Sequence, residues 1–194
     1  MNETAFPKEV DVGGQTVTLR LMARGDGDAI MRFARAINPH DLLFLNRDIR
    51  STKVVAAWED QIEDGRITSI LALRDGQICG CAAVVRDGLS WSPHVSELRV
   101  VTAAELRGSG LGRLLAQESL LLAQQAGAAK VFVRTTVDQV SALAVFQDLG
   151  FRPEALLREH VRDAGGQSHD IAMLSLDLAR QEAGHLSYGF EHVA

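Results

Sequence analysis

The sequence predicts a single mixed α/β domain over residues 1–178, followed by a polar tail over 179–194. The predicted fold is a mostly antiparallel sheet with a central parallel βαβ crossover and flanking helices. Its 194 residues, 46% of them hydrophobic, are enough for one domain with its own core. Strand-like runs separated by Asp-Gly turns precede a strand, a long helix and another strand. No repeat, low-complexity tract or linker divides the chain.

The N-terminal third predicts a hairpin and two helices. Gly13-Gly14 separates two short β-prone stretches, of which the second covers 17–22. Asp26 is the predicted N-cap of a helix whose apolar residues recur at helical spacing until Asn38-Pro39 ends it. A second helix is predicted over 54–64, with a glycine directly after it as the C-terminal signal.

The middle of the chain predicts an antiparallel meander. Its strand-like runs are separated by Asp75-Gly76 and Asp87-Gly88, dipeptides that tight hairpin turns favour because glycine tolerates positive φ. The three predicted strands cover 67–73, 78–86 and 95–101.

The C-terminal half predicts a parallel crossover followed by a second hairpin. A Leu- and Ala-rich helix over 111–126 is followed by a β-branched strand over 130–135, which implies a right-handed βαβ unit. Asp138 is the predicted cap of a further helix that ends at Gly150. The last two strands are predicted at about 154–162 and 170–178.

Charge and hydropathy exclude several classes of protein. Twenty Lys and Arg residues stand against 25 Asp and Glu, and the net charge of -5 argues against a protein that neutralises nucleic-acid phosphates. No apolar run approaches the ~18 residues of a membrane helix, and the first residues lack the order of a signal peptide. We therefore expect a cytoplasmic protein without nucleic-acid or membrane partners.

The cysteines and histidines do not form a metal-site or redox pattern. Cys79 and Cys81 alternate on one predicted strand, which predicts two buried, reduced thiols on the same face and no disulfide. His160 and His169 lie with nearby aspartates on either side of a Gly-Gly hairpin, which fits solvated strand ends better than a metal site. No metal is expected.

The most informative segment is the glycine-rich turn Arg107-Gly108-Ser109-Gly110-Leu111-Gly112 between a strand and a helix. Glycines let the backbone approach an anion, while unpaired N–H groups and the positive end of the helix dipole face it. The Walker pattern GxxxxGK[ST] is absent, and the dinucleotide pattern GxGxxG does not fit. The turn therefore predicts an anion site and disfavours a nucleotidase or a dehydrogenase.

Two motifs resemble the GNAT superfamily of acyl-CoA-dependent N-acetyltransferases. The segment 107–112 matches the family pattern R/Q-x-x-G-x-G/A after a strand. The segment 139–151, with Ala142, Phe146 and Gly150-Phe151, is similar to the family's second landmark, a helix ending in Leu-Gly-Phe. The resemblance extends from Val17 to Leu178, and its last part looks like a bacterial subgroup of mostly unassigned substrate. It makes the predicted fold GNAT-like.

The resemblance implies an acetyl-CoA site on two central strands that diverge. The pantetheine arm lies along strand 95–101 like an added strand, and the turn amides take the CoA diphosphate. Gln139 occupies the position from which the family's Asn commonly contacts the pantetheine arm. The implied acyl-CoA-binding residues are Val100, Val101, Thr102, Arg107, Gly108, Ser109, Gly110, Leu111, Gly112, Gln139 and Phe146.

The resemblance makes Glu97 the leading candidate for the base that deprotonates the acceptor amine. An ion pair with Arg99 or a neighbouring strand is the competing interpretation of Glu97, and His94 is a second candidate base. The family frequently has Tyr at position 146 as a proton donor to the departing thiolate; here Phe146 has no hydroxyl. A backbone N–H near Val100 or Val101 is the expected donor to the carbonyl oxyanion.

The acceptor site is less well defined by sequence. The apolar segment 42–45 is either a packing plug or part of the acceptor wall, because family acceptor sites are commonly framed by this loop. Trp58 falls on the apolar face of its predicted helix, whereas Trp91 is a candidate for the acceptor mouth. The acidic net charge weakly favours a cationic amine.

The sequence therefore predicts an N-acetyltransferase that moves an acetyl group from acetyl-CoA to a primary amine of a small molecule or protein, through a direct ternary complex. The alternative is a non-catalytic acyl-CoA-binding sensor or interaction module, which Phe146 and the uncertain base favour. The sequence is compatible with a homodimer and leaves the oligomeric state open.

Overall fold

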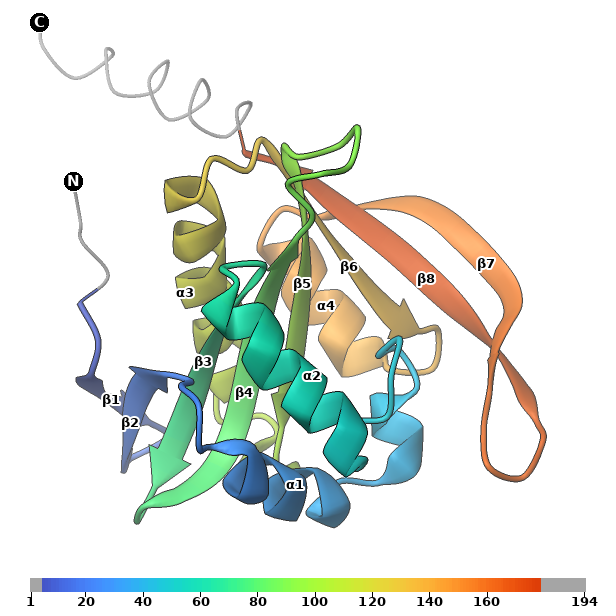
Figure 1. Ribbon diagram of the computed structural model, residues 1–194. Coiled ribbons are helices and arrows are strands. Elements are labelled where there is room, and N and C mark those ends of the chain that lie inside the picture. The colour runs from blue at the N-terminus through green and yellow to red at the C-terminus, as the bar shows by residue number, and fades with distance from the viewer. Residues whose placement is uncertain (1–4, 179–194) are drawn as a thin grey trace, which may run out of the picture.

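A computed structural model describes residues 5–178, which form one eight-stranded sheet with helices on both faces (Figure 1). The strands are β1 (Lys8–Val12), β2 (Gln15–Leu21), β3 (Ile67–Arg74), β4 (Gln77–Arg86), β5 (Val95–Thr102), β6 (Lys130–Thr136), β7 (Arg152–Arg162) and β8 (Ser168–Asp177). The helices are α1 (Gly27–Ala36), α2 (Thr52–Glu63), α3 (Leu111–Gln125) and α4 (Val140–Asp148), with short 3-10 turns η1 (Pro39–Leu42) and η2 (Ala104–Leu106). The predicted tail, 179–194, lies outside the described residues.

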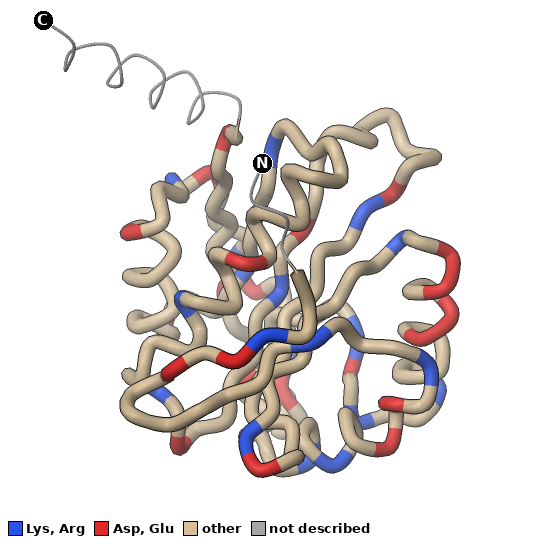
Figure 2. Tube along the Cα trace, turned by 90° about the vertical axis from the view of Figure 1, so that its left-hand side faces the viewer, with Lys and Arg blue, Asp and Glu red and all other residues tan. Residues whose placement is uncertain are grey.

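The sheet separates two groups of helices. Helices α1 and α2 cover one face, and α3 and α4 cover the other (Figures 1 and 2). In Figure 2, which views the sheet from its β1–β2 edge, acidic and basic residues are interspersed along the trace. None of the helices within 5–178 is long and apolar enough to cross a membrane.

The strand order is β1-β2-β3-β4-β5-β6-β8-β7, and only β5 and β6 run parallel. The predicted fold class, a mostly antiparallel sheet with a central parallel crossover, is therefore confirmed. The two parallel strands pair over three residue pairs, the last being Glu97 with Phe132. Beyond that point β5 continues to Thr102 and β6 to Thr136 without pairing with each other, so the sheet opens at its centre.

The two Asp-Gly dipeptides behave differently. Asp75 and Gly76 both have positive φ, 51° and 73°, and form the predicted tight turn between β3 and β4. The prediction of a tight turn at Asp87-Gly88 is wrong, because residues 87–94 form a longer loop and the φ of Gly88 is not positive. The Asp87 carboxylate instead accepts a hydrogen bond from the N–H of Leu89 at 3.1 Å, which opens the loop as an Asx turn.

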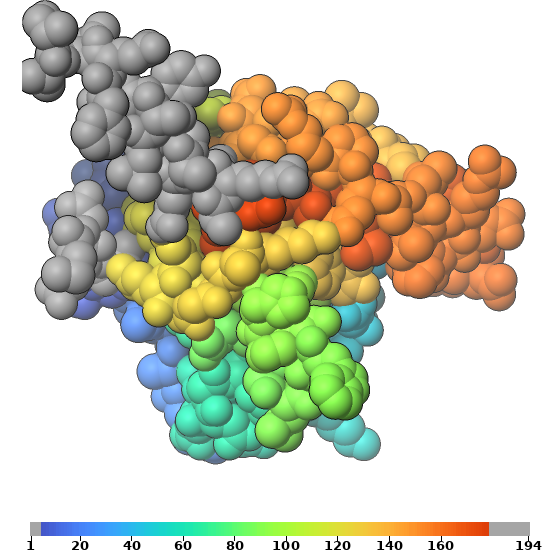
Figure 3. All heavy atoms as spheres, turned by 90° about the horizontal axis from the view of Figure 1, so that it is seen from above, coloured from blue at the N-terminus to red at the C-terminus, as the bar shows by residue number. Residues whose placement is uncertain are grey.

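The loop 87–94 lies at the top of the molecule in Figure 1, and Figure 3 shows it from above, in green. Trp91 and Leu89 are fully exposed there, and Trp91 lines neither of the cavities described below. Its place at the acceptor mouth therefore stays a prediction, without support from either cavity.

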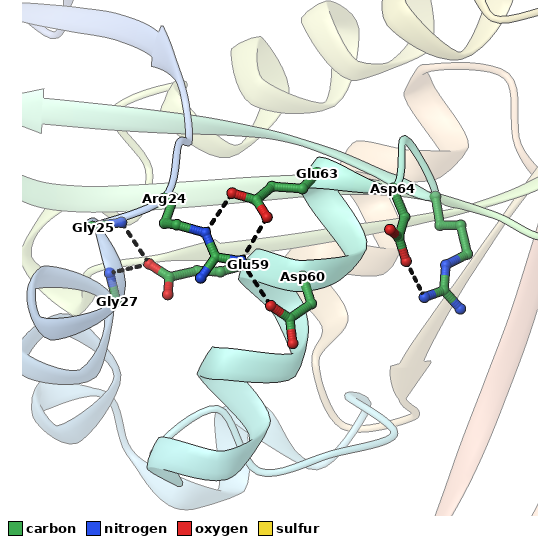
Figure 4. Close-up of polar contacts among 8 residues, drawn as sticks. Arg24, Gly25, Gly27, Glu59, Asp60, Glu63 and Asp64 are labelled. Atoms are coloured by element: carbon green, nitrogen blue, oxygen red, sulfur yellow. Dashed lines mark hydrogen bonds and ion pairs between the residues drawn. The ribbon is translucent and has the colours of Figure 1, made fainter.

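Helices α1 and α2 are held together by polar contacts at the start of α1 (Figure 4). Asp26 occupies the predicted N-cap position, but its carboxylate binds Arg20 and the N–H of Ala23 and caps no helical N–H. The Oε1 of Glu59, on α2, accepts instead from the N–H groups of Gly25 and Gly27, at 2.9 and 3.0 Å. Arg24 adds contacts to Glu63 and to Asp60 on the same helix.

The predicted cap of α4 is wrong. Gln139 holds the N-cap position, without a side-chain hydrogen bond to the helix, and Asp138 lies one residue earlier. The Asp138 carboxylate is engaged by His40, whose Nε2 is 2.6 Å from Asp138 Oδ2. This contact across 98 residues of sequence draws the carboxylate away from the helix end.

The core consists of two clusters of buried residues, and the partly buried Val100 and Leu122 pack against both. Gly80 permits the close approach of α3, because a Cβ there would lie 3.0 Å from Leu115 Cδ1 and 3.1 Å from Leu111 Cδ2. Cys79 and Cys81 are buried free thiols, as predicted. Burial raises the pKa of both thiols, that of Cys81 to about 12.

Candidate functional site

A cleft of about 620 Å³ opens at the point where β5 and β6 diverge. It is bounded by the end of β5, the glycine-rich turn and the start of α4. Nine of the predicted acyl-CoA-binding residues line it: Val100, Val101, Thr102, Arg107, Gly108, Gly110, Gly112, Gln139 and Phe146. The structure thus brings together residues from both sequence motifs.

The glycine-rich turn presents free backbone donors to this cleft. Gly108 and Gly110 have φ of +78° and +94°, in the region where glycine is favoured. The N–H groups of Gly108, Gly110 and Gly112 make no hydrogen bond with any described residue. A Cβ at Gly108 or Gly110 would meet no atom within 4 Å, so the space in front of the turn is open. The turn and the N-terminus of α3 therefore have backbone N–H groups available to donate hydrogen bonds to an anion.

Two arginines add positive charge beside the turn. Arg107 and Arg113 both line the cleft. Arg107 is ion-paired with Asp41 of η1, and Arg113 Nη1 lies 3.2 Å from an oxygen of Asp148. Both guanidinium groups are about half exposed, so these surface pairs are weak and exchangeable with a bound anion.

The edge of β5 that faces the cleft has unused peptide groups. The N–H of Ala103 donates to Cys79 on β4, and Val101 pairs with Cys81 in the same register. Because successive peptide groups of a strand point to opposite edges, Val101 faces β4, whereas Val100 and Thr102 face the open edge. An extended chain with amide groups fits this edge as an added strand.

Gln139 supplies an unsatisfied donor. Its Nε2 is buried and has no hydrogen-bond partner among the described residues, while its Oε1 is 3.3 Å from the Thr135 hydroxyl. A buried amide donor without a partner is costly, and a ligand carbonyl in the cleft would satisfy it. Phe146 lines the same wall and packs edge-to-face on Phe151, with ring centroids 5.4 Å apart.

Two predicted residues do not line the cleft. Leu111 is fully buried in the core beneath the sheet, and the hydroxyl of Ser109 donates to the carbonyl of Leu106 at 2.7 Å. The side chains of Leu111 and Ser109 therefore support the conformation of the turn and do not form part of the cleft wall.

Glu97 lies in a nearly buried ion cluster with two arginines. Its Oε2 is 2.5 Å from Arg99 Nη2, and its Oε1 is 3.0 Å from Arg134 Nε, with a second contact from Arg134 Nη2. Side-chain exposure is 9% for Glu97, 23% for Arg99 and 14% for Arg134. Both carboxylate oxygens are thus occupied, and the cluster carries one net positive charge.

The second candidate base is remote from the cleft. His94 is exposed and precedes β5, seven residues before Val101, so at about 3.3 Å per residue the two are roughly 23 Å apart along the strand.

At the C-terminal hairpin, His169 Nε2 is 2.9 Å from Asp163 Oδ2. Within 5–178, no group of three or more His, Cys, Asp or Glu side chains is arranged to hold a metal ion.

The turn η1 bridges the cleft through one ion pair and one hydrogen bond. Asp41 contacts Arg107 on the glycine-rich side, and His40 contacts Asp138 beside α4. The neighbouring Thr136 side chain and His40 lower the pKa of Asp138. The apolar segment 42–45 begins at the last residue of η1. Leu42 and Phe44 are buried, Phe44 also lines the cleft, and Leu45 lines a second cavity.

The second cavity lies beneath α2, against β3, β4 and β5. Its volume is about 60 Å³. Trp58 is half-buried and lines it, with Nε1 donating to the Ser69 hydroxyl at 3.0 Å. Arg47, Arg99 and Val101 also line it, and Val101 is shared with the large cleft.

These features belong to a known family. The model of the Acetyltransferase (GNAT) family matches residues 34–151, more than half of the chain, and the protein therefore belongs to the GNAT acetyltransferase family. Enzymes of this family take their acetyl group from acetyl-CoA. A search of curated proteins found no match.

Solved structures share the fold. An N-acetyltransferase from Staphylococcus aureus Mu50 superposes with a TM-score of 0.73 at 17% identity, over 84% of this chain and 98% of that one. A ribosomal-protein-alanine N-acetyltransferase from Brucella melitensis gives 0.69 at 22% identity, over 82% and 99%. The yncA protein of Salmonella typhimurium, solved with its cofactor acetyl-CoA, gives 0.70 at 19% identity, over 84% and 94%.

Sequence reasoning missed several residues of the site. Arg113 follows the last glycine of the turn and falls in the first turn of α3, a position that helical geometry alone could have placed beside an anion. Neighbouring residues in the sequence did not indicate a role for Asp41, Arg47 or Arg134. Each reaches the site only because segments distant in sequence pack together.

Proposed function

We propose that this GNAT acetyltransferase transfers the acetyl group from acetyl-CoA to a primary amine of a small molecule or protein, with donor and acceptor bound together. The observation that carries the proposal is the opening between β5 and β6, which joins the glycine-rich turn to a strand edge with free peptide groups. Gln139 Nε2, buried and without a partner among the described residues, supports the same assignment.

In this proposal the chain binds acetyl-CoA at three places. The N–H groups of Gly108, Gly110 and Gly112, with Arg107, take the diphosphate. The open edge of β5 and Gln139 take the amide groups of the pantetheine arm. Phe146 packs against the arm near its thiol end.

The N–H of Val100 is the proposed donor to the carbonyl oxygen of the thioester. It faces the open edge, whereas the peptide group of Val101 is directed toward β4. Transfer forms a bond between the amine nitrogen and the acyl carbon and breaks the carbon–sulfur bond. One proton leaves the nitrogen, and the departing sulfur takes up one proton through solvent.

The cysteines support direct transfer without an acetyl-enzyme. Nucleophilic attack requires a thiolate, and burial raises the pKa of Cys79 and Cys81. Both thiols stay protonated at neutral pH. The ternary-complex mechanism predicts that a Cys81→Ala variant retains turnover.

The role of Glu97 is decided by a variant. If Glu97 is the base, Glu97→Gln lowers turnover and changes its pH dependence while CoA affinity is unchanged. If Glu97 only holds Arg99 and Arg134 in place, the variant loses stability and keeps the pH profile. The occupied carboxylate favours the second outcome, and solvent is then the proton acceptor.

The alternative function is a non-catalytic acyl-CoA sensor or interaction module, favoured by the missing hydroxyl at Phe146 and by the ion-paired Glu97. Release of free thiol from acetyl-CoA with a broad panel of amines supports the enzyme. Tight binding of acetyl-CoA without release above background for any amine supports the sensor. Absence of binding contradicts both, since a ligand at ~100 times its Kd stabilises a protein by about 2.7 kcal/mol and would raise the Tm.

A further inference from the structure

We propose that the small cavity beneath α2 binds the acceptor, and that it selects an amine carried on a small apolar group with an anionic group close by, in preference to polyamines and basic peptides. The inference rests on the proposed acetyl transfer and names the class of acceptor. It reverses the weak expectation of a cationic amine drawn from net charge.

The position of the cavity places an acceptor next to the donor. Val101 lines the cavity on one side and the large cleft on the other. The same residue follows Val100, whose N–H faces the open edge of β5. An amine at this end of the cavity therefore lies next to the site proposed for the thioester.

The size and lining of the cavity suit a small apolar group. Its volume is about 60 Å³, a tenth of that of the cleft, so it holds a side-chain-sized group and not a cofactor. Most of its wall is apolar and comes from Leu45, Ile49, Val54, Trp58, Ile67 and Val101. Burial of an aliphatic side chain here contributes favourable free energy of binding.

The charged groups of the wall are all cationic. Arg47 and Arg99 line the cavity, and no Asp, Glu or His among the described residues does. Arg47 makes no hydrogen bond or ion pair with any residue in the described part of the chain. The Nη2 of Arg99 donates a hydrogen bond to Glu97, but the Nε of Arg99 is buried and has no hydrogen-bond partner among residues 5–178.

The neighbouring ion cluster does not cancel this charge. Glu97 is shared between Arg99 and Arg134, so the three residues together remain positive by one unit. Within a partly buried site, an ammonium ion is repelled by this charge and a carboxylate is attracted. A polyamine brings additional positive charges and is disfavoured further.

The absence of a proton acceptor in the wall favours a weakly basic amine. An α-amine has an ordinary pKa of about 7.7 to 8.0, against about 10.4 for a lysine side chain. At pH 7.5 the neutral fraction is therefore roughly 200-fold larger for the α-amine. The acceptor class that meets all these conditions is an α-amine with a small apolar side chain and a carboxylate within a few atoms.

The test measures acceptor binding directly through Trp58. The chain has two tryptophans, and Trp91 is fully exposed, so a Trp91→Phe background leaves the fluorescence of Trp58 as the signal in the cavity. With CoA saturating, we titrate the dipeptide amides Leu-Asp and Leu-Asn, which differ only in one charge, and spermidine. A decapeptide that begins Leu-Asp distinguishes a protein N-terminus from a small molecule as the source of the α-amine.

The expected result is that Leu-Asp amide binds about 10-fold or more tightly than Leu-Asn amide, and that spermidine binds most weakly. Arg99→Gln should remove this preference, and Arg47→Gln, at an exposed position, should reduce it about 3-fold. Lys53→Gln removes an exposed charge from α2 outside the cavity and should change nothing. Arg134→Gln leaves Glu97 paired with Arg99 alone, so the cluster becomes neutral although the cavity wall is unchanged, and the preference should weaken.

Equal affinity for the two dipeptide amides, or tightest binding of spermidine, overturns the inference. If acetyl-CoA binds and cationic amines are acetylated with a KM that Arg47→Gln leaves unchanged, the acceptor class is wrong while the proposed transfer stands. If acetyl-CoA itself does not bind, the proposed function fails and this inference fails with it. Because Arg47 is exposed, its variant is expected to fold even if Arg99→Gln does not.

Discussion

A substitution at Gly110 tests the anion site most directly. Gly110 has φ of +94° and precedes the first residue of α3, and a Cβ there would meet no atom within 4 Å. Any L-residue therefore bears a backbone cost of about 1–2 kcal/mol but causes no clash. Asn and Asp enter this conformation more readily than other residues and are nearly equal in shape. Gly110→Asn thus measures the backbone cost, and Gly110→Asp adds one negative charge to it.

The expected difference between the two variants follows from Coulomb's law. A carboxylate about 5 Å from one phosphate charge is repelled by about 3 kcal/mol at an effective dielectric constant of ~20. Screening at the open turn reduces this to about 1.5–3 kcal/mol, which corresponds to roughly 10- to 150-fold weaker binding of CoA.

Calorimetric titration with CoA at low and high salt measures the difference, which should shrink as salt rises. Pantetheine, which lacks the diphosphate, is the control and should bind the two variants equally. Equal CoA affinity for Gly110→Asn and Gly110→Asp would remove the glycine-rich turn from the proposed site.

Three further variants test other parts of the structure. Asp41→Asn frees Arg107 from an exposed ion pair and should tighten CoA binding about 2- to 5-fold by calorimetry; weaker binding would show that the pair helps to build the site. Gly80→Val forces a side chain against Leu115 and should lower the free energy of unfolding by about 1–3 kcal/mol in urea, and an unchanged midpoint would contradict the packing described. A hydrogen bond from Arg20 on β2 lowers the pKa of Asp26. The free energy of unfolding that this carboxylate contributes is therefore present above its unfolded pKa of about 3.9, and it is lost as the pH falls through the lower folded pKa. Urea unfolding of wild type and Asp26→Asn should therefore differ at pH 6 and converge once the pH lies below the lowered pKa of Asp26; a constant difference would rule out the carboxylate as the cause.

Local rules were sufficient where the deciding contacts are close in sequence. The turn at Asp75-Gly76 needs positive φ at both residues, which these two residue types accept. The same reasoning failed at Asp87-Gly88, where the Asp87 carboxylate binds a nearby N–H and a longer loop results. Hydropathy periodicity placed every helix and strand within a few residues.

Predictions failed where a distant partner took over a local role. Asp138 was predicted to cap α4, but His40 holds its carboxylate. Asp26 has the predicted N-cap position, but its carboxylate binds Arg20, and Glu59 of α2 serves the start of α1 instead. In each case a side chain from another element binds the carboxylate, and reasoning from neighbouring residues does not detect that partner.

By itself the sequence determined the family, the sheet with its parallel crossover, and the glycine-rich turn, because turn residues, hydropathy period and glycine spacing act over a few neighbouring positions. The tertiary structure alone decided where charges meet. It placed Glu97 between two arginines and Asp41 on Arg107, and it put Arg47 and Arg99 around one small cavity. Those encounters depend on how elements far apart in sequence pack, and packing is a property of the whole core.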